Sequence, residues 1–439
     1  MKKLLFIALT FCISQTKAQI ITTVAGAGGA GFTGDNGQAT SAELNLPKGV
    51  AIDAAGNMYI VDESNSRIRK VNTSGVITTI AGTASYGFNG DNGPATAATL
   101  YTPAGMSIDA AGNLIIADED NFCIRKINTA GIITTIAGMG GSAGFTGDGG
   151  QATAAKLIRP YAAQYDAAGN LYITDTQNNR IRKVNTSGII TTIAGNGTAG
   201  FAGDNGQATA AELNGPDALA FDPAGNLYIA DVANIRIRMV NTAGIISTYA
   251  GTGVAGYNAD GIAATAAQLN NPCGVVVDGA GNLYIGDGNN NRIRKVTKST
   301  GIISTIAGTG AAGFGGDGGP ATAALLHLPV GMAFDANGSL YFAEATNNRI
   351  RKITNVAQSG IATFNIQNST LRIYPNPANN KITIDADDVL DIKLFDVLGK
   401  QISSTKQNQL DVSNLPEGVY FIQVQTKQGN TSQKIIVQH

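Results

Sequence analysis

Six aspartates recur in a glycine-rich setting, and they are the residues whose type and spacing best suit a metal. The setting reads "GDNG" or "GDGG" five times and "ADG" once. A carboxylate beside glycines in a tight loop can hold calcium through side-chain and backbone oxygens. The full twelve-residue calcium loop ending in Glu is absent, and Asp-Gly is also common in plain turns, so both interpretations stay open. The six are Asp35, Asp91, Asp148, Asp204, Asp260 and Asp317.

A second set of charges also recurs, as an acid followed five positions later by an arginine. The acids are Asp62, Asp118, Asp175, Asp231, Asp287 and Glu344, and the arginines are Arg67, Arg180, Arg236, Arg292 and Arg349. A residue that is present in every repeat is better explained by a structural role within the repeat than by a role in a single functional site. We therefore predict an ion pair within each unit, and not a catalytic group. In the second unit Cys123 replaces the arginine, which leaves Asp118, Glu119 and Asp120 less compensated.

Residues that stand outside the repeated text are better candidates for a specific site. Aromatic and arginine side chains suit a partner surface, although each could instead pack its own loop. The chain has no Trp, so a platform for sugars would depend on Tyr. The candidate binding residues are Tyr86, Tyr101, Arg159, Tyr161, Asp217 and His327.

The residue types also limit which enzymes the chain could be. His327 and His439 are the only histidines, which excludes a histidine-rich zinc site. A metal site made of carboxylates and Asn is not excluded by such a count. No serine elbow, Cys/His pairing or phosphate loop occurs, and the many GxG strings are turn glycines. We therefore assign no catalytic residue.

The elements that must position these residues follow from the repetition. The aspartate of "DxxGN" returns every 56 or 57 residues, at Asp53, Asp109, Asp166, Asp222, Asp278 and Asp335. Each unit holds four short apolar runs, which in the first copy read "GVAID", "NMYIVD", "RIRKV" and "VITTIAG". Turn sequences such as "AAG" and "NTS" separate them, so each unit predicts four antiparallel strands. Sheets of this kind stacked radially form a β-propeller.

The count of strands predicts how the ring closes. Six sets of first-to-third strands and six fourth-strand runs are present, but the first fourth-strand run, at 21–26, precedes any partner. We therefore expect "ITTVAG" to complete the sixth blade beside Arg349–Ile353, which removes the open sheet edges. About 20 residues separate each "AG" from the next first strand, and we expect these long segments to share one rim with the loops between second and third strands. That rim is the predicted binding face.

The text of the repeat resembles a known family. "GNLYIADVANIRIRMV", from Gly225 to Val240, is similar to the NHL repeat. The resemblance covers residues 19–353 and implies a six-bladed propeller with a binding role. Some six-bladed propellers that resemble this one are lactonases or lyases, so a metal-dependent hydrolase, lactonase or lyase is the alternative, and a structural surface protein is a third interpretation.

The two ends of the chain predict export. Residues 1–18 carry Lys2 and Lys3, an apolar run and small residues before Gln19, as in a secretory signal peptide. After a polar linker at 354–370, residues 371–439 contain "LRIYPNPANNKITI", "LPEGVYFIQVQ" and "KIIVQ". These motifs resemble the C-terminal sorting domain of the type IX secretion system, a small Ig-like β-sandwich. The resemblance implies the secretion machinery as a partner, followed by release or attachment at the cell surface.

Composition limits the remaining partners. A net charge of -1 gives no bulk attraction for nucleic acid, and no segment of the mature chain could span a bilayer as a helix. Cys123 and Cys273 fall in the second and fifth of six units, on opposite sides of a closed ring, so we expect free thiols. The whole pattern favours an exported propeller that binds a protein, peptide or glycan.

Overall fold

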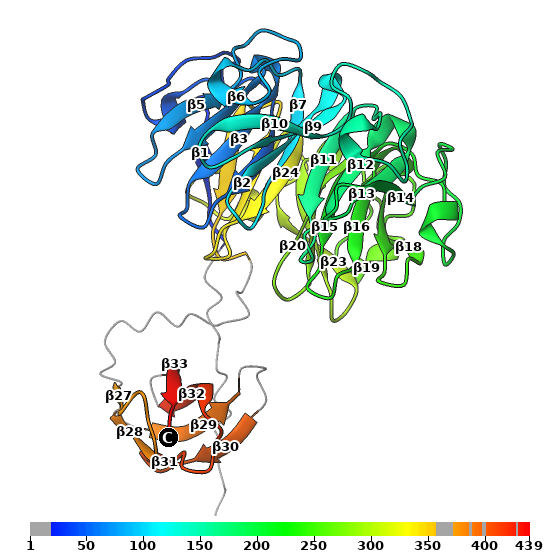
Figure 1. The fold of residues 1–439 in the computed structure, drawn as a ribbon. Coiled ribbons are helices and arrows are strands. Elements are labelled where there is room, and N and C mark those ends of the chain that lie inside the picture. The colour runs from blue at the N-terminus through cyan, green and yellow to red at the C-terminus, as the bar shows by residue number, and fades with distance from the viewer. Residues whose placement is uncertain (1–18, 357–371, 386–388, 397–400, 427–428) are drawn as a thin grey trace, which may run out of the picture. The chain divides into compact units, whose positions relative to one another are not determined.

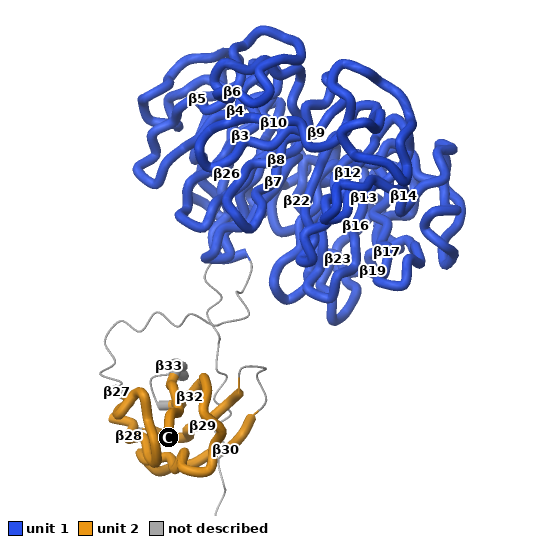
Figure 2. The backbone as a smooth tube through the Cα atoms, in the orientation of Figure 1, with its two compact units in different colours: residues 1–360 blue, residues 361–439 orange. Residues whose placement is uncertain are grey.

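The chain forms two compact units, residues 1–360 and 361–439 (Figure 2). The computed structural model describes residues 19–356, 372–385, 389–396, 401–426 and 429–439. The predicted signal peptide and most of the predicted linker lie outside the described residues. No helix in the described part is long and apolar enough to cross a membrane.

Unit 1 consists of six antiparallel sheets arranged as the blades of a propeller (Figure 1). Blades 1 to 3 are β2 (Pro47–Ile52), β3 (Met58–Asp62), β4 (Arg67–Val71), β5 (Ile77–Ala81); β7 (Pro103–Ile108), β8 (Leu114–Asp118), β9 (Cys123–Ile127), β10 (Ile132–Ala137); and β11 (Pro160–Tyr165), β12 (Leu171–Asp175), β13 (Arg180–Val184), β14 (Ile190–Ala194). Blades 4 to 6 are β15 (Pro216–Phe221), β16 (Leu227–Asp231), β17 (Arg236–Val240), β18 (Ile246–Ala250); β20 (Pro272–Val277), β21 (Leu283–Asp287), β22 (Arg292–Thr297), β23 (Ile302–Ala307); and β24 (Pro329–Phe334), β25 (Leu340–Glu344), β26 (Arg349–Ile353), β1 (Ile21–Ala25). Two short strands, β6 (Gly93–Pro94) and β19 (Ile262–Ala263), add to blades 2 and 5.

The ring closes as the strand count predicts. β1 pairs antiparallel with β26, with Ile21 opposite Ile353 and Thr23 opposite Arg351. The first strands contact one another in the order β2, β7, β11, β15, β20, β24 and back to β2. The N-terminal strand therefore supplies the fourth strand of the last blade, and the predicted six-bladed fold is confirmed.

Local sequence explains both the turns and the tight centre of the ring. In the first hairpin, the Asp53 carboxylate accepts hydrogen bonds from the backbone N–H groups of Ala55 and Asn57, and Gly56 has a φ of +86°. At the axis, a Cβ on Gly105 would clash with the carbonyl oxygen of Tyr161 in the next blade. Glycine at this position lets neighbouring first strands approach closely.

The long segments and the loops between second and third strands lie on one rim, as predicted. In blade 1 the Asn65 side chain donates a hydrogen bond of 2.7 Å to the carbonyl of Gly31 in the long segment. We call this face the long-loop rim. Its 3₁₀ helices are η1 (Ala39–Ser41), η3 (Ala95–Ala97), η5 (Ala152–Ala154), η7 (Ala208–Ala210), η9 (Ala264–Ala266) and η11 (Ala321–Ala323) in the long segments, and η2 (Glu63–Asn65), η4 (Glu119–Asn121), η6 (Thr176–Asn178), η8 (Val232–Asn234) and η10 (Gly288–Asn290) in the short loops.

Unit 2 is a β-sandwich, as expected from its alternating strands. One sheet has the order β27 (Arg372–Tyr374), β28 (Lys381–Asp385), β31 (Gln409–Asp411), and the other β30 (Gln401–Thr405), β29 (Val389–Phe395), β32 (Gly418–Thr426), β33 (Gly429–Val437). Ile382 and Ile384 of the first sheet share a buried core with Leu394 and Ile422 of the second.

Candidate functional site

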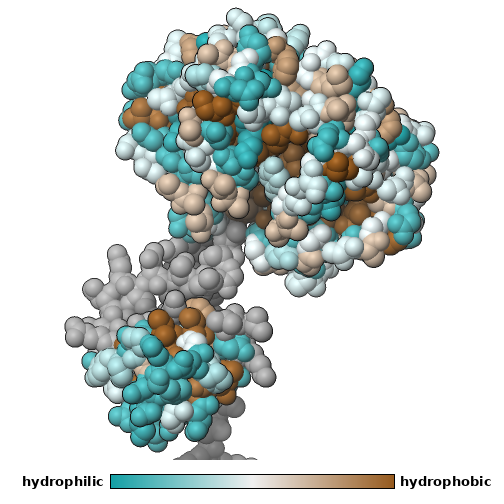
Figure 3. Space-filling view, in the orientation of Figure 1, coloured by the Kyte–Doolittle hydropathy of each residue, from teal (hydrophilic) through white to brown (hydrophobic). Residues whose placement is uncertain are grey.

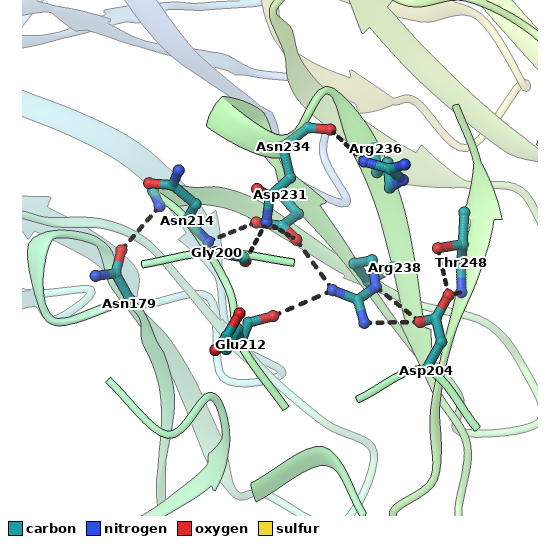
Figure 4. A network of polar contacts seen from close by, with 11 residues as sticks. Asn179, Gly200, Asp204, Glu212, Asn214, Asp231, Asn234, Arg236, Arg238 and Thr248 are labelled. Carbon is teal, nitrogen blue, oxygen red and sulfur yellow. Dashed lines mark hydrogen bonds and ion pairs between the residues drawn. The ribbon is translucent and has the colours of Figure 1, made fainter. Parts of the chain in front are cut away.

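Each blade contains a fully buried arginine that ties the long segment to the blade. In blade 4, Arg238 donates to Asp231 at the end of β16 at 3.2 Å and to Asp204 in the long segment at 2.7 Å (Figure 4). The other oxygen of Asp204 accepts hydrogen bonds from the hydroxyl and backbone N–H of Thr248. One guanidinium thus holds two carboxylates in place. Its hydrogen bonds are charge-assisted and share one network, so they are stronger than isolated hydrogen bonds between neutral groups.

The same arrangement recurs in all six blades. The guanidinium lies 2.6 to 2.9 Å from the loop aspartate and 3.1 to 3.5 Å from the acid that ends the second strand. The arginines are Arg69, Arg125, Arg182, Arg238, Arg294 and Arg351.

This arrangement corrects the predicted ion pairs. The partner of Asp62 is Arg69, seven residues later, and not Arg67. Although Arg67 lies opposite Asp62 in the sheet register, its guanidinium stacks 3.5 Å from the centre of the Phe32 ring. Arg69 lies two residues further along β4 on the same face of the strand. There it is buried and reaches the carboxylates of both Asp62 and Asp35.

The donor set around the six loop aspartates does not fit a calcium ion. The Oδ1 atom of Asp35 already lies 2.8 Å from the guanidinium of Arg69, so a cation stands where a calcium ion would need further oxygens. Burial raises the pKa of Asp35, but hydrogen bonds from Thr79 and Arg69 outweigh it and lower the pKa overall. Among the described residues, no three His, Cys, Asp or Glu side chains gather as a metal-binding group.

One measurement can test whether the loop aspartates bind calcium, which stays a prediction from the sequence. These aspartates are Asp35, Asp91, Asp148, Asp204, Asp260 and Asp317. Because each carboxylate is already paired, we expect the melting temperature of unit 1 in the full chain to be the same in calcium and in EDTA. A ligand that binds the native state must raise that temperature by mass action. A calcium-dependent rise that is lost in Asp204→Asn, but kept when a carboxylate of unit 2 is neutralised, would restore the calcium interpretation.

A different group of charged residues lies where the axial channel opens on the long-loop rim. A cavity of about 410 Å³ follows the first strands of all six blades, and the space-filling surface is visibly hollowed in the middle of the ring (Figure 3). Lys48, Tyr161 and Cys273 line its end on that rim. We call the group around this end the mouth cluster. It comprises Lys48, Glu63, Glu119, Asp120, Arg159, Tyr161 and Asp217.

Arg159 holds the acids of the second blade. Its guanidinium lies 2.7 Å from Glu119 and 3.2 Å from Asp120, and Asp120 also accepts a hydrogen bond from the Thr102 hydroxyl. Burial raises the pKa of Glu119 to about 7, and the charge of Arg159 opposes that rise. The predicted shortage of positive charge at Cys123 is therefore wrong, because Arg125 pairs with Asp118 and Arg159 pairs with the other two acids.

Lys48 reaches across the mouth from blade 1 to blade 3. Its ammonium lies 3.3 Å from the hydroxyl of Tyr161 and 3.7 Å from Glu63. Burial raises the pKa of Asp217 to about 7, and Lys48 and Arg159 oppose that rise. Burial also raises the pKa of the Cys273 thiol to about 12. Cys123 and Cys273 are free and buried, as expected.

The structure brings five of the six predicted binding residues to one side of the rim. The rings of Tyr86 and Tyr101 lie 5.2 Å apart and are exposed. The backbone of Tyr101 accepts a hydrogen bond from Asp120, which connects this pair to the mouth cluster. His327 belongs to blade 6, where its backbone N–H donates to Glu344. In the described part of the chain, no hydrogen bond or ion pair joins the His327 side chain to the cluster.

Sequence reasoning missed Lys48 and Glu63. Lys48 occupies a position that is filled differently in every blade, and Glu63 occupies a position where only the first two blades have Glu. The residue after the proline that begins each first strand is Lys48, Ala104, Tyr161, Asp217, Cys273 or Val330. Variation at one fixed place in an otherwise constant repeat was the available signal, and Lys48, Ala104, Tyr161 and Cys273 at this place do line the axial cavity.

Two family models match the chain. The model described as "Teneurin NHL domain" matches residues 25–89, 87–144, 141–201 and 197–258, which together cover more than half of the chain. The model described as "Secretion system C-terminal sorting domain" matches residues 372–438.

Curated proteins and solved structures agree with these matches. Teneurin-1 of Homo sapiens is 31% identical over 231 residues, which are 47% of this chain and 8% of that protein. Protein SUPPRESSOR OF QUENCHING 1, chloroplastic, of Arabidopsis thaliana is 29% identical over 326 residues, 71% of this chain and 30% of that protein. The chain thus spans less than a third of either relative. A Bacteroides thetaiotaomicron protein described as of unknown function has a TM-score of 0.59 at 20% identity, covering 77% of this chain and 76% of its own. An auxiliary nutrient binding protein of the same organism has a TM-score of 0.56 at 17% identity, covering 76% of each chain. At these identities the structures show a shared fold.

Proposed function

Because the chain belongs to the NHL-repeat family that the Teneurin NHL domain represents and carries a secretion-system sorting tail, we propose that it is an exported protein that binds an extracellular ligand at the mouth cluster. The type IX machinery is the partner of residues 371–439, and the propeller is delivered outside the outer membrane. The ligand is a protein, peptide or glycan presented to the long-loop rim.

The asymmetry of the mouth is the observation that carries this proposal. The buried arginine networks repeat six times and therefore build the blades, whereas the mouth cluster draws different residues from blades 1 to 4. Polar and charged groups gathered at the opening of a concave cavity are typical of a ligand site. The exposed Tyr86–Tyr101 pair extends the same surface outward and provides aromatic contact area.

Array binding with a matched pair of lysine variants tests the proposal. The full chain, Lys48→Met and Lys126→Met would be applied to peptide arrays and glycan arrays. Lys126 is a fair control because its side chain is 29% exposed, against 23% for Lys48, and it pairs with Asp109 in a hairpin at the opposite ends of the strands.

We expect Lys48→Met to lose at least tenfold of the binding signal, since it removes the cation that spans the mouth. Lys126→Met should bind like the unaltered chain. The proposal fails if the two variants bind the same ligands with equal strength, or if the unaltered chain binds nothing on either array.

A further inference from the structure

The axial cavity extends beyond the mouth cluster along the first strands, and its walls are largely apolar. They include Val50, Met106, Leu219 and Met332, around a volume of about 410 Å³. Hydrophobic residues, drawn brown, are visible in the hollow in the middle of the ring (Figure 3). Among the described residues that line the cavity, Lys48 alone carries a charge. A cavity of this size with predominantly apolar walls is typical of a small-molecule site.

The end of the cavity away from the mouth cluster is surrounded by one apolar or aromatic residue from each blade. Two of these residues pack edge to face on tyrosines of the second strands, with 4.8 Å between the ring centres of Phe221 and Tyr172 and 5.0 Å between those of Phe334 and Tyr284. Such packing holds the wall in place, so an apolar ligand would leave water without ordering the site first. The six residues are the last of each first strand, Ile52, Ile108, Tyr165, Phe221, Val277 and Phe334.

The polar groups at the mouth end leave one hydrogen-bond donor without an acceptor. The ammonium of Lys48 donates to the hydroxyl oxygen of Tyr161 at 3.3 Å, and both residues line the cavity. Within the described part of the chain, the Tyr161 hydroxyl makes no other hydrogen bond, so its proton is available to an acceptor. A hydroxyl that accepts a hydrogen bond from a cation is itself a stronger donor.

We propose that the axial cavity binds a small uncharged molecule that has an apolar body and a carbonyl oxygen at one end. The Tyr161 hydroxyl donates to that oxygen at the mouth end, and the body lies along the apolar walls toward Phe221 and Phe334. This inference goes beyond the proposed function, because it assigns a second, small ligand inside the ring and not a macromolecule on the rim.

The charges around the cavity favour an uncharged ligand over either kind of ion. No carboxylate is among the described residues that line the cavity, so a ligand ammonium would lose its hydration without gaining a counter-ion. Lys48 is the one cation in the lining, and its ammonium already lies 3.7 Å from Glu63. A ligand carboxylate would have to share Lys48 with Glu63, and two like charges placed together repel.

Ligand-observed NMR titration of the full chain at pH 7 tests this inference with four probes of similar size. Acetophenone is uncharged and has a carbonyl oxygen, whereas ethylbenzene is uncharged and has no acceptor. Benzoate and benzylamine carry opposite charges. We expect acetophenone and ethylbenzene to bind, and we expect benzoate and benzylamine to bind at least tenfold more weakly than acetophenone.

Tyr161→Phe separates the hydrogen bond from the shape of the cavity, because it keeps the ring and removes the hydroxyl. It should weaken acetophenone about fivefold, which is the effect of one hydrogen bond, and leave ethylbenzene unchanged. Tyr165→Phe is the matched control, since it makes the same change four residues further along β11, or about 13 Å away. Gln164→Met removes another polar group of the wall. Neither control should change the affinity for acetophenone, and circular dichroism would establish that all three variants are folded.

Three results would overturn the inference. These are no binding of acetophenone, binding of benzoate or benzylamine as tight as that of acetophenone, and a Tyr161→Phe variant in which acetophenone and ethylbenzene are affected equally or not at all. Array binding is measured separately with Lys48→Met, so the two proposals can fail independently. If acetophenone behaves as expected while the arrays show no dependence on Lys48, the cavity site stands and the proposed function is wrong. In the opposite case, the proposed function stands without the cavity site.

Discussion

Replacing Arg238 with methionine should lower the free energy of unfolding of the propeller by about 3–5 kcal/mol, the cost of breaking a buried ion pair from one side. Methionine fills similar volume but leaves Asp231 fully buried beside an apolar side chain, and it releases Asp204 from the blade. Because the chain has no Trp, urea unfolding would be followed by circular dichroism and tyrosine fluorescence. The transition of unit 2 should not move.

Arg236→Met is the matched control in the same strand. Arg236 stacks 3.7 Å from the centre of the Phe201 ring and donates to the backbone oxygens of Asn234 and Thr252, and it is only partly buried. Its loss should cost about 1 kcal/mol. Adding Asp231→Asn to Arg238→Met should cost less than the two single changes added together, because it removes the stranded charge. Equal losses in Arg236→Met and Arg238→Met would contradict the assignment of the network.

Deleting residues 19–27 should lower the melting temperature of unit 1 by at least about 10 °C, if the ring folds at all. The deletion removes β1, whose Ile21 and Ala25 are fully buried, and leaves the edge of β26 unpaired. Burial of one isoleucine in a core contributes about 2–5 kcal/mol, and the lost ladder hydrogen bonds add to it. Differential scanning calorimetry of the full chain and the deletion measures the change.

A rearranged chain separates the loss of a strand from the loss of length. In it, "ITTVAG" is moved behind Ile353 through a five-residue connection like Asn72–Val76, which joins the third and fourth strands of blade 1. This chain should recover most of the lost stability. An unchanged melting temperature in the deletion would show that β1 does not close the ring.

Much of the fold could be predicted because the same pattern of strands and turns occurs six times in the sequence. The spacing of Asp53 and its equivalents sets the number of blades, and the unpartnered run at 21–26 predicts the closing strand. Burial depth could not be predicted in the same way. Arg67 and Arg69 belong to one "RIRKV" motif and share a face of the strand, so the sequence does not say which of them is fully buried.

The site was only partly predictable for a related reason. Tyr161 and Asp217 stand out because they are unusual where they occur, and they do lie at the mouth. No feature of the local sequence distinguishes Lys48 from other lysines. Its contact with Tyr161 depends on the closed ring, which places blades 1 and 3 around one axis. Contacts between residues 113 positions apart follow from ring closure and not from any local motif.

The pairing of β1 with β26 also dictates an order of events along the chain. Each of blades 1 to 5 is made from consecutive residues, whereas blade 6 is complete only when Ile21 of β1 pairs with Ile353 of β26. Contacts of such high sequence separation form late, because the chain between them must first be ordered. Closure joins the two ends of unit 1 within residues 21–353, ahead of the sorting sequence at 372–438. A proteolytic cut between residues 357 and 371 would therefore release the sorting tail and leave every strand pair of the ring intact.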